Sequence, residues 1–289
     1  MFLVTGANGQ LGSELRKTLG NSAVYVDKHI LDITDEMAVK NYLSSTSFEC
    51  IINCAAYTAV DKAEDEYEQS DAVNRLGPTW LAKYGKFIVH ISTDYVFDGK
   101  SYLPYCETDQ PNPLSVYGKT KLEGEKAVLE NAETAIIIRT GWLYSSSGNN
   151  FLKTMLHLGK TRDSINVVFD QIGSPTNARD LAKTITEILP QVTKNNKSIY
   201  HFTNEGVCSW YDFAHAIMQM ARLSCKVNPI TSENYPTKAQ RPHYSLLDKS
   251  KIKHDYRLKI KHWHDALRIF MEEEQEQLGL DFLKNNEQI

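Results

Sequence analysis

The chain has 289 residues, of which 42% are hydrophobic and 24% charged, which is the composition of an ordinary folded protein of one or two domains. Its formal net charge of −4 argues against nucleic-acid binding, because domains that bind nucleic acid are usually markedly basic. No apolar run approaches the ~20 residues that a membrane-spanning helix needs. The composition therefore excludes a disordered chain, a membrane protein and a typical nucleic-acid binder.

The cysteines and the start of the chain indicate the cellular setting. Five cysteines without a Cys-x-x-Cys pair fit neither a disulfide framework nor a zinc site, and we expect reduced, mostly buried thiols. The first motif begins at Thr5, which leaves no room in front of it for a secretion signal. We expect a cytoplasmic protein.

Short apolar segments alternate with amphipathic segments in the first half of the chain. This pattern predicts βαβ units and a parallel sheet with helices on both faces. The expected strands cover residues 2–5, 23–26, 50–53, 87–92 and 135–139. The expected helices cover residues 10–19, 35–43, about 71–84 and about 116–131. The predicted fold class is α/β, a doubly wound Rossmann-type parallel sheet with right-handed crossovers.

The alternation loosens after Trp142, where we expect the chain to leave the sheet. A helix with Asn177 as its N-cap and Pro190 after its end, followed by a strand, predicts that the chain then returns. The later segments would build a smaller α+β lobe; they are a helix over 210–223, a proline-punctuated stretch over 227–247 and a solvated Glu/Gln-rich helix face over 272–277. We predict a dinucleotide-binding domain from residues 1–142 plus about 170–204. The C-terminal substrate lobe would take about 143–169 plus 205–289.

A glycine-rich motif follows the first strand and opens the first helix. Gly6, Gly9 and Gly12 have the spacing G-x-x-G-x-x-G. Such glycines permit a tight turn, a close backbone approach to a dinucleotide pyrophosphate and close helix–sheet packing. Asp27 ends the second strand at the position where an acid would meet an adenosine ribose, which favours NAD. Lys28 and His29 follow and would suit a 2′-phosphate, so the choice between NADH and NADPH stays open.

A second group of residues has the chemistry of carbonyl reduction. Tyr117 and Lys121 lie four residues apart at the start of a helix, so both occupy one helix face. A nearby ammonium is expected to lower the pKa of the phenol toward neutrality, where the phenol can exchange a proton with a carbonyl or hydroxyl group. Thr93 ends the fourth strand, and parallel sheets bind ligands at the carboxyl ends of their strands. Its hydroxyl could donate a hydrogen bond to the same substrate oxygen. The three residues predict an active site for hydride transfer to a ketone.

These features together resemble the extended short-chain dehydrogenase/reductase superfamily over about the first 200 residues. They are the glycine motif, Asn53 to Ala56 at a strand end, Thr93 and Tyr117-x-x-x-Lys121. A narrower similarity, to the dTDP-4-dehydrorhamnose reductases, extends over nearly the whole chain. It depends on the strings GQLG (9–12), AAYTAVDKAE (55–64), STDYVFDG (92–99), DQIGSPT (170–176) and RP (241–242).

The resemblance implies reduction of the C4 ketone of dTDP-4-dehydro-6-deoxy-L-mannose to dTDP-L-rhamnose with NADPH, NADH being the alternative. The implied cofactor residues are Gly9, Gln10 and Leu11 at the pyrophosphate, Asp32 and Ile33 at the adenine, and Ala55, Ala56 and Tyr57 along the path to the nicotinamide. Tyr117 would donate a proton and Lys121 would hold the nicotinamide ribose. Thr93, Asp94 and Trp142 would hold the sugar. Arg241 is our inference for the nucleotide pyrophosphate, because a guanidinium fork matches phosphate oxygens; a surface salt bridge is its alternative.

Three points stay open at this stage. Some relatives use Mg²⁺ between acidic side chains at a dimer contact, and Glu14 stands in a matching place, but its partner acids are not evident and we expect no metal. The protein would be a monomer or a homodimer. An epimerase-like enzyme of the same fold, which would retain NAD⁺, and a non-catalytic regulatory subunit are the rival functions. A dehydratase is disfavoured because Thr93-Asp94-Tyr95 lacks the glutamate of that class.

Overall fold

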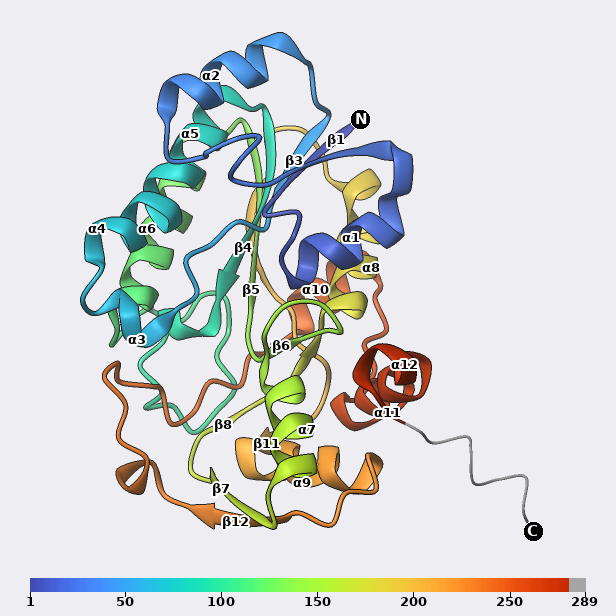
Figure 1. Cartoon of the computed structure of the whole chain (residues 1–289). Coiled ribbons are helices and arrows are strands. Elements are labelled where there is room, and N and C mark those ends of the chain that lie inside the picture. Colours follow the sequence, from blue (N-terminus) through green and yellow to red (C-terminus); the bar gives the residue numbers. More distant parts are fainter. Residues whose placement is uncertain (281–289) are drawn as a thin grey trace.

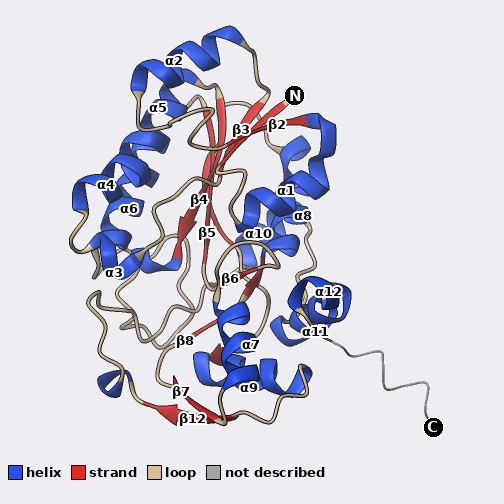
Figure 2. Ribbon diagram, viewed as in Figure 1, coloured by secondary structure: helices blue, strands red, loops and turns tan. Residues whose placement is uncertain are grey.

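The computed structural model describes residues 1–280, and a six-stranded parallel sheet forms its centre (Figures 1 and 2). The strand order is β10-β5-β4-β3-β1-β2. The strands are β1 (Phe2–Thr5), β2 (Ala23–Val26), β3 (Cys50–Asn53), β4 (Phe87–Thr93), β5 (Thr134–Thr140) and β10 (Lys197–His201). The order reverses between β1 and β3, and such a reversal opens a crevice at the carboxyl ends of the strands. The predicted doubly wound α/β fold is confirmed.

Helices cover both faces of the sheet. One face carries α1 (Gln10–Leu19), α8 (Ala178–Ile188) and α10 (Ser250–Tyr256), and the other carries α2 (Glu36–Ser45), α5 (Gly77–Tyr84) and α6 (Val116–Asn131) (Figure 1). Successive residues of a strand point to opposite faces, so Val4 of β1 packs in the first core and Leu3 in the second. Both side chains are fully buried. The sheet is therefore a rigid platform between two apolar layers.

The segment predicted as one helix over 71–84 is more complex. It consists of α4 (Tyr67–Asp71), a π-helical turn (Ala72–Leu76) and α5, and the short α3 (Val60–Ala63) precedes it. The π-helical turn presents Asn74, whose side chain accepts a hydrogen bond from the Tyr57 backbone at 2.9 Å. A Cβ on Gly124 of α6 would lie 2.1 Å from the Asn74 carbonyl oxygen. Close packing against α6 thus accompanies the altered helical winding.

A second group of elements has its own apolar core. It contains α7 (Phe151–Thr161), β7 (Ser164–Val168), α9 (Trp210–Met220), β12 (Lys226–Ile230), α11 (Trp263–Glu273) and α12 (Gln275–Leu278). Strands β7 and β12 pair in parallel at the lower end of Figure 2. Two short pairs join this group to the sheet region: β6 (Leu143–Tyr144) with β9 (Thr176–Asn177), and β8 (Ile172–Gly173) with β11 (Cys208–Ser209). Four 3₁₀ turns complete the described elements: η1 (Gly20–Ser22), η3 (Asp94–Val96), η4 (Leu189–Gln191) and η5 (Ser232–Asn234).

The predicted division into two domains stays a prediction, and one segment packs differently from it. Helix α10 was expected in the substrate lobe, but Ile252 and Tyr256 pack in a core of the central sheet. The last part of the predicted lobe, residues 281–289, lies outside the described residues. Asn177 does cap α8, because its side chain accepts from the Arg179 backbone at 2.9 Å.

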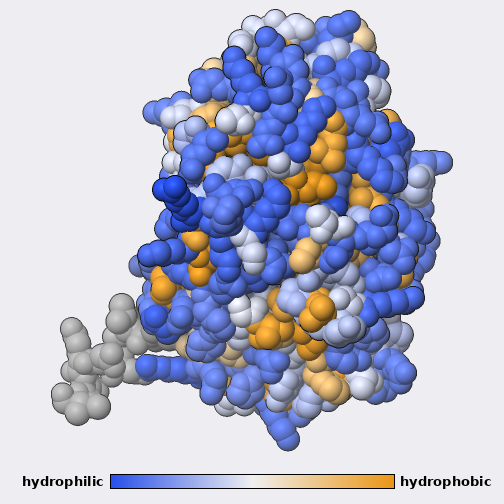
Figure 3. All heavy atoms as spheres, turned by 180° about the vertical axis from the view of Figure 1, so that it is seen from behind, coloured by the Kyte–Doolittle hydropathy of each residue, from blue (hydrophilic) through white to orange (hydrophobic). Residues whose placement is uncertain are grey.

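The Glu/Gln-rich segment 272–277 was expected to be a solvated face, and for Glu274 this is wrong. Glu274 is buried and forms ion pairs with Arg179 and Lys17. The surface seen from behind is mainly hydrophilic, with a few apolar clusters (Figure 3). In the part of the chain that the structure describes, no helix has the length and apolarity needed to cross a membrane.

Candidate active site

A cavity of about 600 Å³ lies at the carboxyl ends of β1, β4 and β5. Its lining comes from both parts of the chain and includes many of the residues predicted from the sequence: Gly6, Gly9, Gln10, Leu11, Gly12, Ala56, Thr93, Asp94, Tyr117, Lys121 and Trp142. The structure therefore brings the glycine motif and the Thr93, Tyr117 and Lys121 group to one crevice.

The glycine motif forms a wall that consists mainly of backbone. Gly6 has a left-handed backbone with φ of 65°, and a Cβ there would lie 2.6 Å from the Ala55 nitrogen. A Cβ on Gly12 would lie 2.5 Å from the Gly6 carbonyl oxygen. Helix α1 begins at Gln10, so its first N–H groups are available for an anion at the cavity. This tight cradle fits a dinucleotide pyrophosphate.

Thr93 and Tyr117 face each other across the cavity. Thr93 ends β4, and its hydroxyl lies within hydrogen-bonding reach of the Tyr117 phenol and 3.1 Å from Asp94 Oδ1. Tyr117 belongs to the first turn of α6, which Ser115 caps by accepting from the Gly118 backbone at 3.2 Å. A Cβ on Gly118 would lie 2.3 Å from the Tyr95 carbonyl oxygen, so glycine permits this close approach.

The protonation of Tyr117 differs from the expectation. Burial raises the pKa of the Tyr117 phenol to about 12; the Thr93 hydrogen bond opposes this shift and the Asp94 charge adds to it. Lys121 is not among the groups that shift the pKa of Tyr117, and its Nζ donates to the Ile91 carbonyl oxygen at 2.6 Å. The phenol therefore keeps its proton at neutral pH, which is the state that a proton donor needs.

Lys121 and Asp94 are both buried charged groups. Burial lowers the pKa of Lys121 to about 8, against the opposing influence of Glu125 and Cys54. Burial raises the pKa of Asp94 to about 6, although hydrogen bonds from Ser245 and Thr93 favour its carboxylate. A Cβ on Gly141 would lie 2.7 Å from Asp94 Oδ2. Both groups thus titrate closer to neutrality than usual, which is common in active sites.

An aromatic stack forms the opposite wall of the cavity. The ring of Trp142 lies 3.6 Å from that of Trp210, and the two planes are 9° apart. Trp142 has a left-handed backbone, with φ of 52°. Trp210 was predicted as the start of a helix but not as a site residue; Ser209, directly before it, caps α9 in a capping box with Asp212. No local pattern indicates that its ring meets Trp142.

A loop over residues 145–150 closes the cavity beside α1. Asn150 Nδ2 donates to Gln10 Oε1 at 2.9 Å, and Ser145 Oγ donates to the same oxygen at 3.3 Å. Gly148 and Asn150 both line the cavity. Sequence reasoning missed this loop, because its residues meet Gln10 only in the folded chain.

Five of the predicted cofactor residues do not line the cavity and make contacts within the chain. Asp27 accepts from Asn8 Nδ2 at 2.7 Å, which holds it against the glycine motif. Asp32 accepts from the Thr34 hydroxyl at 2.7 Å, Ile33 is buried against Gly77, and the Tyr57 hydroxyl donates to Glu66. Ala55 donates its backbone N–H to Asn53 Oδ1 at 3.2 Å. Their roles toward a cofactor stay predictions.

Arg241 is paired with a carboxylate. Its Nη2 donates to Asp61 Oδ2 at 2.7 Å and its Nη1 donates to Asp61 Oδ1 at 3.1 Å. The pair joins the segment after η5 to α3, and it holds the pKa of Asp61 below its usual range. This contact is the salt-bridge alternative considered for Arg241, and a role at a pyrophosphate stays a prediction.

The residues around Glu14 do not fit a divalent cation. Glu14 is buried and accepts from Lys17 Nζ at 2.8 Å. Arg179 lies 3.5 Å from Glu14 and also pairs with Glu273 and Glu274, so a guanidinium occupies the centre of the acidic group. Among residues 1–280, no group of three or more His, Cys, Asp and Glu side chains is arranged to hold a metal ion.

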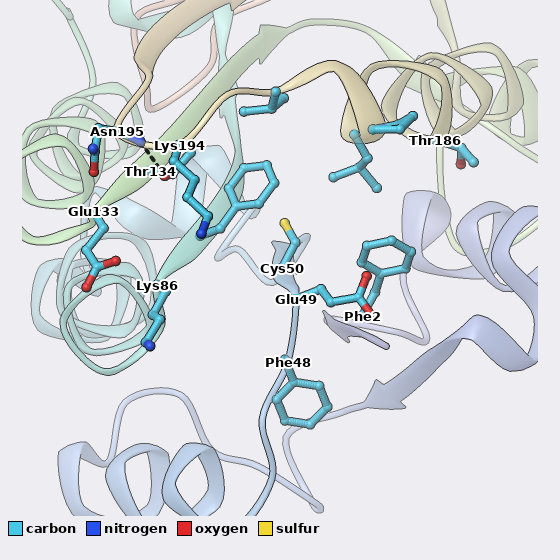
Figure 4. Close-up of a pocket in the computed structure, with 14 residues that line it drawn as sticks. Phe2, Phe48, Glu49, Cys50, Lys86, Glu133, Thr134, Thr186, Lys194 and Asn195 are labelled. Carbon is cyan, nitrogen blue, oxygen red and sulfur yellow. Dashed lines mark hydrogen bonds between the residues drawn. The ribbon is translucent and has the colours of Figure 1, made fainter.

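A second cavity, of about 730 Å³, lies at the other end of the sheet (Figure 4). Phe2, Cys50 and Thr134, at or near the amino ends of β1, β3 and β5, line it together with Lys86 and Lys194. Parallel sheets bind ligands at their carboxyl ends, so this cavity is not the crevice that the fold provides for catalysis.

Comparison with known proteins agrees with the geometry of the site. The family model described as RmlD substrate binding domain matches residues 1–276. The chain is 43% identical over 285 residues to dTDP-4-dehydrorhamnose reductase of Aggregatibacter actinomycetemcomitans, covering 92% of this chain and 97% of that protein. It is 39% identical over 278 residues to spore coat polysaccharide biosynthesis protein SpsK of Bacillus subtilis (strain 168), covering 94% of this chain and 96% of that protein.

A solved structure gives the same result for the fold. The crystal structure of dTDP-4-dehydrorhamnose reductase from Bacillus anthracis in complex with NADP matches with a TM-score of 0.90 and 38% sequence identity. The match covers 94% of this chain and 98% of that one. The chain belongs to the RmlD substrate-binding-domain family.

Proposed function

We propose that this chain reduces the C4 ketone of dTDP-4-dehydro-6-deoxy-L-mannose to dTDP-L-rhamnose, the last step of dTDP-rhamnose synthesis. The observation that carries the proposal is the position of Tyr117 opposite Thr93, one helical turn before Lys121 and in the same cavity as the glycine motif. The relatives from Aggregatibacter and Bacillus anthracis are named dTDP-4-dehydrorhamnose reductase, which supports the substrate assignment.

Tyr117 is the proton donor in this proposal. Its raised pKa keeps the phenol protonated, so it can give the proton to the substrate oxygen as negative charge develops there. The Thr93 hydroxyl donates a hydrogen bond to the same oxygen, which stabilises that charge. Lys121 contacts the nicotinamide ribose hydroxyls and exchanges a proton with the phenolate that remains.

A nicotinamide cofactor, when bound, supplies the hydride. Residues 6–12 would hold its pyrophosphate through backbone N–H groups, and Asp27, Asp32 and Ile33 would hold the adenosine. Ala55, Ala56 and Tyr57 follow the path toward the nicotinamide. We assign NADPH as the preferred cofactor, which the NADP complex of the Bacillus anthracis relative supports.

The substrate is a dTDP-sugar bound on the Trp142 side of the cavity. The flat surface of Trp142 and Trp210 suits the apolar face of a sugar or a base. The Asp94 carboxylate accepts from sugar hydroxyls, and Arg241 reaches the diphosphate from the edge of the site.

The test follows NADPH oxidation with the dTDP-4-keto sugar as substrate, and repeats it with NADH. We expect stoichiometric oxidation, a higher kcat/KM with NADPH than with NADH, and dTDP-L-rhamnose identified by mass spectrometry. Binding of NADPH without any net oxidation would contradict the proposal and favour an epimerase or a non-catalytic protein.

A further inference from the structure

Three buried polar side chains lie in a row across the sheet and lead to Lys121. The strand register pairs Thr5 of β1 with Asn53 of β3, and Asn53 with His90 of β4. The distances are 2.7 Å from Thr5 Oγ1 to Asn53 Oδ1, 3.0 Å from Asn53 Nδ2 to His90 Nδ1, and 3.4 Å from His90 Nε2 to Lys121 Nζ. All four side chains are at most 1% exposed. The reaction proposed above uses Lys121 and leaves the other three without a role.

A backbone amide sets the direction of the hydrogen bonds in this row. The Ala55 N–H donates to Asn53 Oδ1 at 3.2 Å, and the Thr5 hydroxyl donates to the same oxygen. Asn53 therefore directs its amide nitrogen, which can only donate, toward His90 Nδ1. Because Nδ1 must accept this bond, a neutral imidazole carries its proton on Nε2.

His90 is held in that neutral form. Burial lowers the pKa of His90 well below its ordinary value, and the Lys121 charge lowers it further. The Nε2–H is therefore directed at Lys121 Nζ, where a neutral amine offers a lone pair and an ammonium offers none. The Ile91 carbonyl oxygen accepts from Nζ at 2.6 Å in either state.

The other groups around Lys121 do not cancel the effect of His90 on its protonation. Glu125 on the same helix favours the ammonium, but Arg139 of β5 donates to its two oxygens at 2.9 and 2.7 Å and offsets its charge. Cys54, after β3, also favours the ammonium, and Asp94, Tyr95 and Tyr117 are the other titratable groups in the cavity lining. His90 is thus an uncharged side chain within hydrogen-bonding distance of Nζ, beside the Ile91 carbonyl oxygen.

We propose that His90 is a positioning residue for Lys121, whose Nε2–H holds Nζ in place and favours the neutral amine. The inference rests on the proposed function, in which Tyr117 gives its phenolic proton to the substrate oxygen. An N–H bond of the Lys121 ammonium then breaks, its proton forms the new O–H bond of Tyr117, and a neutral amine remains. A group that favours the amine makes this proton return easier.

The first experiment compares kcat as a function of pH in three variants. His90→Phe removes both ring nitrogens, and the alkaline limb of the profile, where Lys121 loses its proton, moves up by about one pH unit. His90→Gln restores an N–H donor near the Nε2 position and returns the limb toward the wild-type pH. His201→Phe is the matched control, because His201 is another fully buried histidine on β10, and it leaves the limb in place. An unmoved limb in His90→Phe, or an equal shift in His201→Phe, overturns the proposal.

The second experiment determines the tautomer of His90 directly and does not depend on enzymatic activity. Wild-type protein with ¹⁵N-labelled histidine is measured by long-range ¹H–¹⁵N correlation, with His90→Phe used to assign the signals. We expect a neutral ring protonated on Nε2 across the stable pH range. A proton on Nδ1 overturns the proposal even if the chain proves to be a reductase. If the Nε2–H tautomer is found but no keto sugar is reduced, the proposed function fails and the row of hydrogen bonds stands.

Discussion

The two walls of the cavity are built in different ways. The wall formed by the glycine motif comes from consecutive residues, 6–12, and its closest approaches are between backbone atoms. The aromatic wall comes from segments far apart in the chain, and its main contact is between the Trp142 and Trp210 rings. Backbone contacts cannot relax around an added atom, whereas side chains can move. We therefore expect the first wall to be intolerant of substitution and the second to be adjustable.

The largest expected effect concerns the residue between the two walls. Tyr117→Phe removes the proton donor but keeps the ring, so kcat should fall by about 10²- to 10⁴-fold. NADPH binding, measured by fluorescence titration, should stay the same. Tyr95→Phe is the control, because Tyr95 packs edge-on against Tyr117 at 5.6 Å. Wild-type turnover in Tyr117→Phe would remove the phenol from the mechanism.

A matched pair of glycines tests the difference in rigidity. Gly12→Ala in α1 places a Cβ 2.6 Å from the Ala7 Cα atom, whereas Gly159→Ala in α7 meets the flexible end of Met218. We expect Gly12→Ala to lose about 1–3 kcal/mol of unfolding free energy and to weaken NADPH binding at least about tenfold. Gly159→Ala should lose less unfolding free energy, because alanine favours the helix and the Met218 side chain can move. Urea unfolding and NADPH titration compare the two variants, and equal losses of unfolding free energy would show that the backbone contact and the side-chain contact are equally rigid.

The aromatic wall should govern substrate affinity alone. Trp210→Leu removes the stacked ring, which is worth about 1 kcal/mol, and the KM for the dTDP-sugar should rise about fivefold. The KM for NADPH should be unchanged. Trp80→Leu, in a core on the other side of the sheet, is the control for losing a tryptophan. A parallel rise in both KM values would mean that the two walls act as one unit.

The smallest expected effect is that of a chelator. Arg179 and Lys17 already neutralise Glu14 and Glu274, so EDTA and Mg²⁺ should leave the initial rate and the Tm unchanged. Arg179→Gln should lower the Tm, because it leaves buried carboxylates with less positive charge. Thermal unfolding with and without EDTA checks both statements. A loss of activity in EDTA that Mg²⁺ restores would contradict the reading of the Glu14 region.

Helices, strands and motifs that lie within one short stretch of sequence were predicted well. The periodic apolar pattern located α1, α6 and the first three strands at their exact bounds. The glycine motif and the pair of Tyr117 and Lys121 were visible because each lies within one short segment. Residues that meet only after folding gave no such signal: Trp210 beneath Trp142, Asn150 on Gln10, and Arg179 among the glutamates.

Protonation was predicted less well than position. The spacing of Tyr117 and Lys121 suggested an ammonium that lowers the pKa of the phenol. In the folded chain, burial dominates and the Lys121 amine is directed to a β4 carbonyl, so the pKa moves upward. Desolvation depends on the complete environment, which no local spacing contains. The same reason explains Glu274, whose acidic neighbours in the sequence suggested solvent exposure.

The left-handed backbone of Trp142 restricts which residues fit this position, where the chain leaves the sheet. A left-handed conformation costs a non-glycine residue about 1–2 kcal/mol, and here the Thr176 N–H holds the Trp142 carbonyl at 3.1 Å. Glycine would remove that cost but also the aromatic ring. A β-branched residue would keep a bulky side chain but raise the conformational cost. Glycine at position 142 thus removes an aromatic surface of the cavity. At position 142 the cavity gains a stacked aromatic ring at the cost of a strained backbone.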